Sequence, residues 1–454
     1  MARRIKSDQK SASLPPIARR RMSRRVFLKV TGVGLAGTSF LGIASCTGGS
    51  GGGTGSEFTL TFGPDDTGSL QKAIDRFNEE YSGRYKASYR EMPADTGQYF
   101  DQLQTELQAG SSEIDLIGAD VIWPAQLASQ GFIVDLSDRF TEEERGQFLP
   151  GPIEALTYNG SVWGVPWRTN TGMLYYRQDL LEENGFNNPP TTWDELKQMA
   201  RTVQQNSGTQ YGLLFQGADY EGGVANALEY IWSAGGEVLD ANDPDRVLID
   251  SSGAREGLSI ERSTVDDDVA PQSVATFKEP EVQSTFLNGD AVFARHWSVM
   301  YGLISNPKES SITTDQVGVA PLPVASTSDQ SVSCLGGWNW CINSNSANLE
   351  AAWEFIKFHT SAEQQKNGAL EGTLLPTRRE LYDDQELAEE VPVIPLAREM
   401  AENTRPRPVS PYYQDMSLKM AEQFNASLKG DTSPEEATQT LQGELEQIVE
   451  QGQA

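Results

Sequence analysis

The sequence has few residues that could support catalysis through histidine or zinc. Its 454 residues include two histidines and three cysteines. His296 and His359 have no partner at the spacing of metal ligands, and the patterns HExxH, CxxC and GxSxG are absent. We therefore expect no metal, no cofactor and no histidine-dependent hydrolysis. A pair of carboxylates stays open as a catalytic device, because a chain with 64 Asp and Glu always includes some close pairs.

Basic residues are scarce beyond the N-terminus. Residues 46–454 hold 26 Lys and Arg against 63 Asp and Glu, a net charge near −37. Nucleic-acid binding needs basic side chains that neutralise phosphates, and lying on anionic lipid needs a basic face. The composition argues firmly against both partners. A solvated acidic surface that keeps the protein soluble is the plainest explanation of the charge, and a salty habitat is the alternative.

The uncharged segment near the N-terminus is too short to span a membrane. Residues 30–45 are sixteen apolar or small residues, whereas a bilayer-spanning helix needs about 20. Ten Lys and Arg precede them within residues 1–29, and Cys46 follows. This order of charged, apolar and small-residue zones is typical of a secretory signal peptide.

Two short motifs refine the interpretation of this leader. Residues 23–29 (SRRVFLK) match the twin-arginine export pattern, and residues 43–46 (IASC) resemble the bacterial lipobox. We predict a signal peptide over 1–45, a lipidated Cys46 bearing acyl chains such as palmitate, and a flexible Gly/Ser linker completing 46–56. An uncleaved signal anchor with an incidental cysteine is the alternative.

Cys334 and Cys341 are the other two cysteines. In an exported protein they could form a disulfide. Two buried thiols on one strand are an equally good interpretation, in which the odd spacing of seven places them on opposite faces. The sequence leaves both possibilities open.

Strand-like and helix-like segments alternate along the rest of the chain. Residues 58–62, 85–89 and 115–119 have strand patterns, the last ending at Asp120, and each of the first two precedes a helical apolar stripe. Such repeats predict an α/β fold with a largely parallel sheet, whose ligands lie beyond the carboxyl ends of the strands.

Later helices have clear start signals, and aromatic segments separate them. Thr192 and Glu195 form a capping box, and Ser433-Pro434 begins a final helix that should bury Ala437, Leu441, Leu445 and Ile448. We expect five aromatic-rich segments to be loops: 166–172, 215–223, 294–301, 336–340 and 405–413.

At this point the chain resembles the extracellular solute-binding proteins (family 1) of carbohydrate ABC importers, and within them the trehalose/maltose-binding branch. The resemblance runs from about Phe58 to the last helix. The segments that carry it are VPWRTNTGMLYYRQDLLEENGFNNPPTTWDEL (165–196), FQGADYEG (215–222), FLNGDAVFARHW (286–297), VGVAPLP (317–323), LGGWNW (335–340) and RPRPVSPYY (405–413).

The resemblance implies a two-lobed, periplasmic-binding-protein-like fold of type II. Crossing strands would form its hinge, and one ligand would bind in the cleft between the lobes. The family pattern places lobe 1 at 57–165 plus 322–365 and lobe 2 at 166–321 plus 366–454.

The chemistry of a sugar suggests which residues line that cleft. A sugar has hydroxyls on its rim and apolar C–H patches on its faces, so it needs aromatic platforms and paired hydrogen-bonding groups. Trp297 and Trp338 are the expected platforms, although each could be a core tryptophan. Gly337, with Gly336, would let backbone approach the ring, or would shape a strand bend.

Six polar residues complete the expected ligand site. Five of them have a plainer alternative: a helix cap or loop acid for Asp66 and Asp120, a turn for Tyr220 and Glu221, and a structural ion pair for Arg407, which Arg405 could replace. Relatives tend to have Asp where this chain has Asn170, and can have Arg where it reads Gln98-Tyr99-Phe100. The expected set is Asp66, Asp120, Asn170, Tyr220, Glu221 and Arg407.

These observations predict a binding subunit, not an enzyme. It would capture a disaccharide such as trehalose or maltose by lobe closure, as a monomer held by lipid on the outer face of the cell membrane, and deliver it to ABC permease subunits driven by a cytoplasmic ATPase. Three alternatives remain: a carbohydrate-active enzyme using Asp120 and Glu221, a binder of another solute, and a sensor lipoprotein that presents its sugar to a receptor.

Overall fold

A computed structural model describes residues 56–65, 67–241 and 243–453. The predicted signal peptide, Cys46, the linker as far as residue 55, and Asp66 lie outside these residues. Within them, no helix combines the length and the apolar character needed to cross a bilayer.

Nine strands of the described residues form one sheet, in the order β2-β1-β3-β12-β6-β10-β7, with β11 paired to β6 and β13 paired to β12. Two further pairs, β4–β5 and β8–β9, are separate hairpins. The bounds are β1 Ser56–Phe62, β2 Tyr85–Glu91, β3 Leu116–Asp120, β4 Thr157–Tyr158, β5 Ser161–Val162, β6 Val165–Arg177, β7 Tyr211–Leu214, β8 Leu239–Asp240, β9 Asp243–Val247, β10 Ala291–Trp297, β11 Val317–Ala320, β12 Ser333–Ile342 and β13 Thr404–Arg405.

The centre of the sheet is antiparallel, so the prediction of a largely parallel sheet holds only for its outer strands. β1 pairs in parallel with β2 and β3, and β10 with β7, as β-then-α units require. β12 instead runs antiparallel to both β3 and β6, and β6 runs antiparallel to β10. The central strands are not joined by βαβ crossovers, which the alternation of local patterns could not show.

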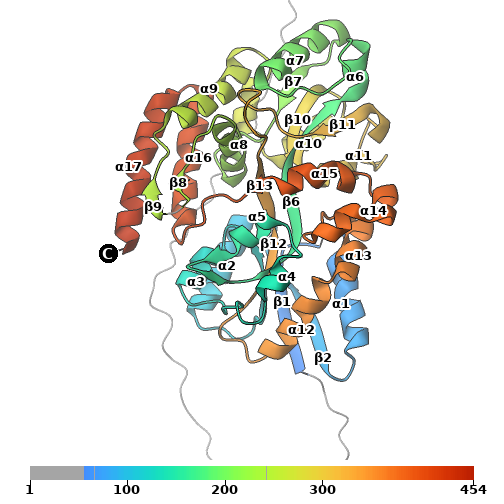
Figure 1. Cartoon of the computed structure of the whole chain (residues 1–454), viewed down its shortest axis with the longest axis vertical. Coiled ribbons are helices and arrows are strands. Elements are labelled where there is room, and N and C mark those ends of the chain that lie inside the picture. The colour runs from blue at the N-terminus through green and yellow to red at the C-terminus, as the bar shows by residue number, and fades with distance from the viewer. Residues whose placement is uncertain (1–55, 66, 242, 454) are drawn as a thin grey trace, which may run out of the picture. The chain divides into compact units, whose positions relative to one another are not determined.

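β6 and β12 are long strands, and here the sequence prediction was wrong. Residues 166–172 and 336–340 were expected to be loops, yet the first lies inside β6 and the second inside β12. Both strands are buried on both faces, so neither shows the polar–apolar alternation of a half-exposed strand. In Figure 1, β6 and β12 run between the group that contains β1 and β2 and the group that contains β7 and β10.

The helices cover both groups of strands (Figure 1). Their bounds are α1 Ser69–Glu80, α2 Thr96–Gln108, α3 Pro124–Ser129, α4 Glu142–Arg145, α5 Pro150–Ala155, α6 Gln178–Glu183, α7 Trp193–Ser207, α8 Glu221–Ser233, α9 Ser252–Asp266, α10 Glu279–Leu287, α11 Val299–Ile304, α12 Leu349–His359, α13 Ala362–Gly372, α14 Gln385–Glu390, α15 Val393–Glu402, α16 Tyr413–Lys429 and α17 Pro434–Gln453, with short 3-10 turns η1 Gln272–Thr276, η2 Thr314–Gln316 and η3 Arg379–Asp383.

Capping chemistry locates two of these helices as predicted. Thr192 caps α7 and accepts a hydrogen bond from the Glu195 N–H, while the Glu195 carboxylate accepts from the Thr192 N–H. Ser433 and Glu436 make the same reciprocal bonds at the start of α17. In α17, Val449 is buried, and Ile448, predicted to be buried, is only partly covered.

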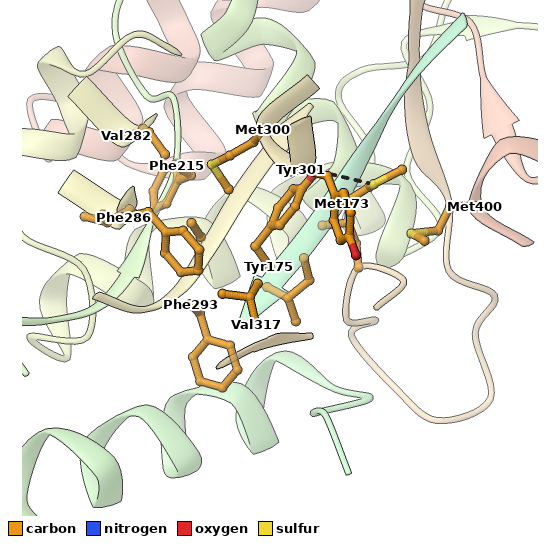
Figure 2. Close-up of a cluster of buried hydrophobic side chains, with 14 of the residues drawn as sticks. Met173, Tyr175, Phe215, Val282, Phe286, Phe293, Met300, Tyr301, Val317 and Met400 are labelled. Atoms are coloured by element: carbon orange, nitrogen blue, oxygen red, sulfur yellow. Dashed lines mark hydrogen bonds between the residues drawn. The ribbon is translucent and has the colours of Figure 1, made fainter. Parts of the chain in front are cut away.

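The core divides along β6. Val165 and Trp167 belong to an apolar cluster with β1, α1 and α12. From Met173 onward β6 contributes instead to a second cluster with β7, β10, α7 and α10. Figure 2 shows part of this second cluster, in which the Tyr175 hydroxyl donates to the Met173 sulfur (3.6 Å). Its labelled side chains are Met173, Tyr175, Phe215, Val282, Phe286, Phe293, Met300, Tyr301, Val317 and Met400.

The cysteines and histidines of the described part are core residues. Cys334 and Cys341 are free, buried thiols on β12, and they pack in different apolar clusters, as opposite faces of one strand require. His359 accepts a hydrogen bond from the Trp340 indole N–H (2.9 Å), and burial lowers its pKa to about 3. It therefore stays neutral at physiological pH.

Candidate functional site

Asp120 and Arg407 meet, although they are far apart in the sequence. Asp120 is the last residue of β3, beside Trp338 of β12 in the register, and Arg407 lies in the segment between β13 and α16. The Arg407 Nη2 atom is 3.5 Å from the Asp120 Oδ1 atom, and it also donates to the Leu335 carbonyl (3.3 Å). Only 5% of the Arg407 side chain is exposed, so this charge depends on its protein partners.

Glu221 is the second carboxylate of this cluster. It is the first residue of α8, where the helix dipole favours a negative charge. Its carboxylate pairs with Arg407 and accepts hydrogen bonds from the hydroxyls of Tyr413 (2.6 Å) and Ser417. Three donors thus already occupy its two oxygens, and its main effect in this structure is to hold Arg407 in place.

Burial raises the pKa of Asp120 to about 6, against the opposing effects of the Arg407 charge and of the Ile122 N–H, which donates to Asp120 (3.2 Å). The carboxyl therefore changes its protonation state near pH 6 and is mostly ionised above pH 7. In that form it can accept hydrogen bonds from two hydroxyls.

Trp338 is half-buried among aromatic rings. Phe62 (4.7 Å between ring centroids) and Trp123 (5.7 Å) pack edge-on to it, and Tyr99 stacks at 6.3 Å. The Arg168 guanidinium lies 5.9 Å from its centroid. Trp338 is therefore packed on several sides by other rings, and it pairs with Asp120 in the strand register.

Gly337 has a backbone role. Its φ is 132°, and a Cβ there would lie 2.6 Å from the Arg168 carbonyl oxygen. The pairing of β12 with β6 shifts register directly after it, between Trp338 and Asn339. These facts favour the alternative that glycine shapes a bend in the strand.

Trp297, Asn170 and Gly336 lie together. A Cβ at Gly336 would be 3.2 Å from the Asn170 Cβ and 3.3 Å from the Trp297 Cζ3 atom. The Asn170 side-chain oxygen accepts from the Ser298 hydroxyl (3.5 Å). Trp297 is half-buried at the end of β10, and the Arg295 guanidinium lies 4.1 Å from its centroid. Gly336 is thus small so that a ring from another strand can approach β12.

Tyr220 is linked to Trp297 by the carboxylate of Glu279, a residue that the sequence analysis did not identify. The Tyr220 hydroxyl donates to the Glu279 Oε2 atom (2.8 Å), and the Trp297 indole N–H donates to the Glu279 Oε1 atom (3.3 Å). Arg168, also missed, lies over Phe62 and Trp167 (5.0 and 4.9 Å) as well as Trp338. Arg168 stands inside the quoted motif, whereas nothing in the sequence around Glu279 marks it.

Some of the residues considered for the ligand site are not found beside Asp120, Arg407 and Trp297. Arg405 pairs with Glu237 and lies over Trp232 (5.1 Å), so it does not replace Arg407. In the stretch Gln98-Tyr99-Phe100, Tyr99 is fully buried and its hydroxyl donates to the Gly118 carbonyl (3.0 Å), whereas Gln98 is exposed. Asp66 lies outside the described residues. Among the described residues, no group of three or more His, Cys, Asp or Glu side chains is placed to hold a metal.

The chain is similar to bacterial solute-binding proteins. A family model described as bacterial extracellular solute-binding protein matches residues 63–366. A Deinococcus radiodurans protein named probable ABC transporter-binding protein is 30% identical over 406 residues, covering 87% of this chain and 94% of its own length. A maltotriose-binding protein of Pyrococcus abyssi is 26% identical over 279 residues, covering 60% of this chain and 56% of its own.

Solved structures agree with the fold. The maltose-bound MalE3 of T. maritima has a TM-score of 0.77 and 36% identity, over 86% of this chain and 98% of its own. The cyclic alpha-maltosyl-1,6-maltose binding protein of Arthrobacter globiformis has a TM-score of 0.75 and 21% identity, over 88% and 100%. The predicted α/β, two-lobed fold of the type II periplasmic-binding class is confirmed.

Proposed function

The chain belongs to the bacterial extracellular solute-binding proteins, and from this membership we propose that it captures a disaccharide of the maltose or trehalose type and delivers it to an ABC importer. The family and its similar structures are substrate-binding proteins, not enzymes, so the enzyme alternative does not apply. In this proposal Asp120 binds the sugar and Glu221 holds Arg407 in place, and neither carboxylate takes part in bond cleavage.

One observation carries the choice of a sugar. Two half-buried tryptophans lie near the charged cluster of Asp120, Arg407 and Glu221. Trp338 is beside Asp120 in the strand register, and Trp297 lies against Gly336, next to Leu335, whose carbonyl accepts from Arg407. Rings that stack on C–H faces, beside ionised groups that bind hydroxyls, suit a carbohydrate. The maltose-bound structure with 36% identity supports a glucose-containing disaccharide in particular.

Hydroxyl recognition would give the site its selectivity. In the proposed complex, Asp120 accepts from two sugar hydroxyls, Arg407 donates to a third, and the Asn170 amide supplies both a donor and an acceptor. Hydrogen bonds to charged groups contribute about 1.5–3 kcal/mol each. A sugar with a misplaced hydroxyl leaves buried partners unpaired and is rejected.

Lobe closure is the proposed mechanism of capture. Arg407 contacts carboxylates from β3 and from α8, which belong to lobe 1 and lobe 2 in the proposed division at 57–165 plus 322–365 and 166–321 plus 366–454. The core changes along β6 between Trp167 and Met173, which supports a boundary in that stretch, a few residues beyond the proposed one at residue 165. Sugar bound to both lobes would favour the closed form by its differential affinity for the two states.

The setting proposed for this capture is the outer face of the cell membrane. A twin-arginine leader would export the chain, and lipid on Cys46 would hold it near its permease while residues 47–56 leave the lobes free to move. We propose that it works as a monomer with permease subunits and a cytoplasmic ATPase.

A thermal-shift panel tests the choice of ligand. The mature chain is heated with maltose, trehalose, other disaccharides, monosaccharides and polyols. A disaccharide at 100 times its dissociation constant should add about 2.7 kcal/mol of stability. Trp297→Ala should remove this shift and still unfold cooperatively. The disaccharide proposal would be overturned if only polyols raised the melting temperature, or if none of the sugars did.

A further inference from the structure

We propose that Glu279 is the positioning residue of the sugar site, which fixes the Trp297 and Tyr220 rings so that they present faces, not polar edges, to the ligand. This inference rests on the function proposed above. It assigns a specificity role to a residue that itself need not touch the sugar.

Glu279 joins two segments that are distant in the sequence. It is the first residue of α10, whereas Trp297 ends β10 and Tyr220 precedes α8. One carboxylate oxygen accepts from the Tyr220 hydroxyl (2.8 Å) and the other from the Trp297 indole N–H (3.3 Å). A single carboxylate therefore fixes the orientation of both rings.

One face of the Trp297 ring is also constrained. Arg295 lies over the ring at 4.1 Å and is itself paired with the buried Glu229, whose carboxylate also accepts from the Cys334 N–H of β12 (2.9 Å). The Arg295–Glu229 ion pair is packed tightly against β6, because a Cβ at Gly172 would lie 2.1 Å from a Glu229 oxygen. Trp297 is thus held by Arg295 on one face and by Glu279 at its polar edge.

These contacts determine what the two rings can offer a ligand. The only polar hydrogen of each side chain already bonds to Glu279, so neither ring has a free donor for a sugar hydroxyl. Lys278 covers part of Tyr220, with its Nζ atom 4.9 Å from the ring centroid. What remains is apolar surface, which suits the C–H face of a pyranose ring. The site should therefore favour sugars with an uninterrupted apolar face.

The test compares carboxylate removal with donor removal. Glu279→Ala loses both contacts, and the double variant Trp297→Phe with Tyr220→Phe keeps both rings but loses both donors. Glu281→Ala is the matched control, since it removes the same charge from the first turn of α10, where the Glu281 carboxylate accepts from the Lys278 N–H while both ring donors bond to Glu279. Affinities of the mature chain for the disaccharide from the panel are measured by calorimetry, with melting temperatures alongside.

Glu279→Ala should weaken disaccharide binding about tenfold or more. The double variant should lose a similar factor, and adding Glu279→Ala to it should cause no further loss. Glu279→Gln, which keeps one acceptor oxygen, should recover part of the affinity, and Glu281→Ala should stay within about twofold of the wild type.

Two results would overturn the inference. One is unchanged affinity in Glu279→Ala. The other is a further loss when Glu279→Ala is added to the double variant, because such a loss would indicate direct contact with the sugar or a purely structural role. If the wild-type chain binds no disaccharide at all, the proposed function fails and the inference falls with it. That outcome is recognised from the wild type alone.

Discussion

Replacing Arg407 with methionine should lower the free energy of unfolding by about 3–5 kcal/mol and remove disaccharide binding. The substitution keeps the bulk of the side chain but leaves Asp120 and Glu221 facing each other in a largely buried site without a cation. Urea unfolding measures the stability, and calorimetric titration measures the binding.

Arg405→Met is the control for this prediction. Arg405 belongs to the same segment, but its ion pair with Glu237 is about one-third exposed, so its loss should cost about 0–1 kcal/mol. If Arg407→Met is too unstable to purify, adding Glu221→Gln should restore part of the stability, because it removes one of the two unpaired carboxylates. Equal stability of Arg407→Met and Arg405→Met would contradict the importance of the buried bridge.

Replacing Glu261 with glutamine should stabilise the protein at alkaline pH. Glu261 is only 2% exposed on α9, its Oε2 atom has no hydrogen-bond partner among the described residues, and burial raises its pKa to about 8. Its usual value is 4.5, so between pH 4.5 and 8 the folded chain holds a proton that the unfolded chain releases. Wild-type stability should fall there by about 1.4 kcal/mol per pH unit, roughly 4–5 kcal/mol in all.

The measurement is the difference in unfolding free energy between wild type and Glu261→Gln at pH 5 and at pH 9. The advantage of the variant should grow with pH up to about pH 8 and then stay constant. Glu256→Gln, on the exposed side of α9, controls for the loss of one negative charge. An advantage of Glu261→Gln that does not change with pH would show that Glu261 finds a partner for its charge.

Local signals in the sequence predicted much of the first half of the fold. The alternation over residues 58–62 located β1, and the Thr192–Glu195 capping box located α7, because both patterns act within a few residues. The expected convergence of Asp120, Glu221 and Arg407 is also found, but as an ion-paired cluster. The plainer alternative for Arg407, a structural ion pair, therefore describes this structure, and a role in ligand binding stays a proposal.

The remaining features depend on long-range packing. β6 contains Pro, Gly and Trp, and β12 contains Gly and Trp, in segments that resemble loops, and only their burial between neighbouring strands makes them extended. Tyr99 is buried by packing against Trp123 and Trp338, and the Gly118 carbonyl of β3 satisfies its hydroxyl. Glu279 acquires its role from two rings that approach it from other segments, which no pattern around residue 279 encodes.

Calorimetric titration of residues 47–454 with maltose and trehalose, followed by chromatography of the recovered sugar, decides whether the chain binds a disaccharide without converting it. We expect saturable binding of one disaccharide per chain and recovery of the sugar unchanged. Absence of saturable binding for every disaccharide tried, or conversion of the sugar to product, would contradict it.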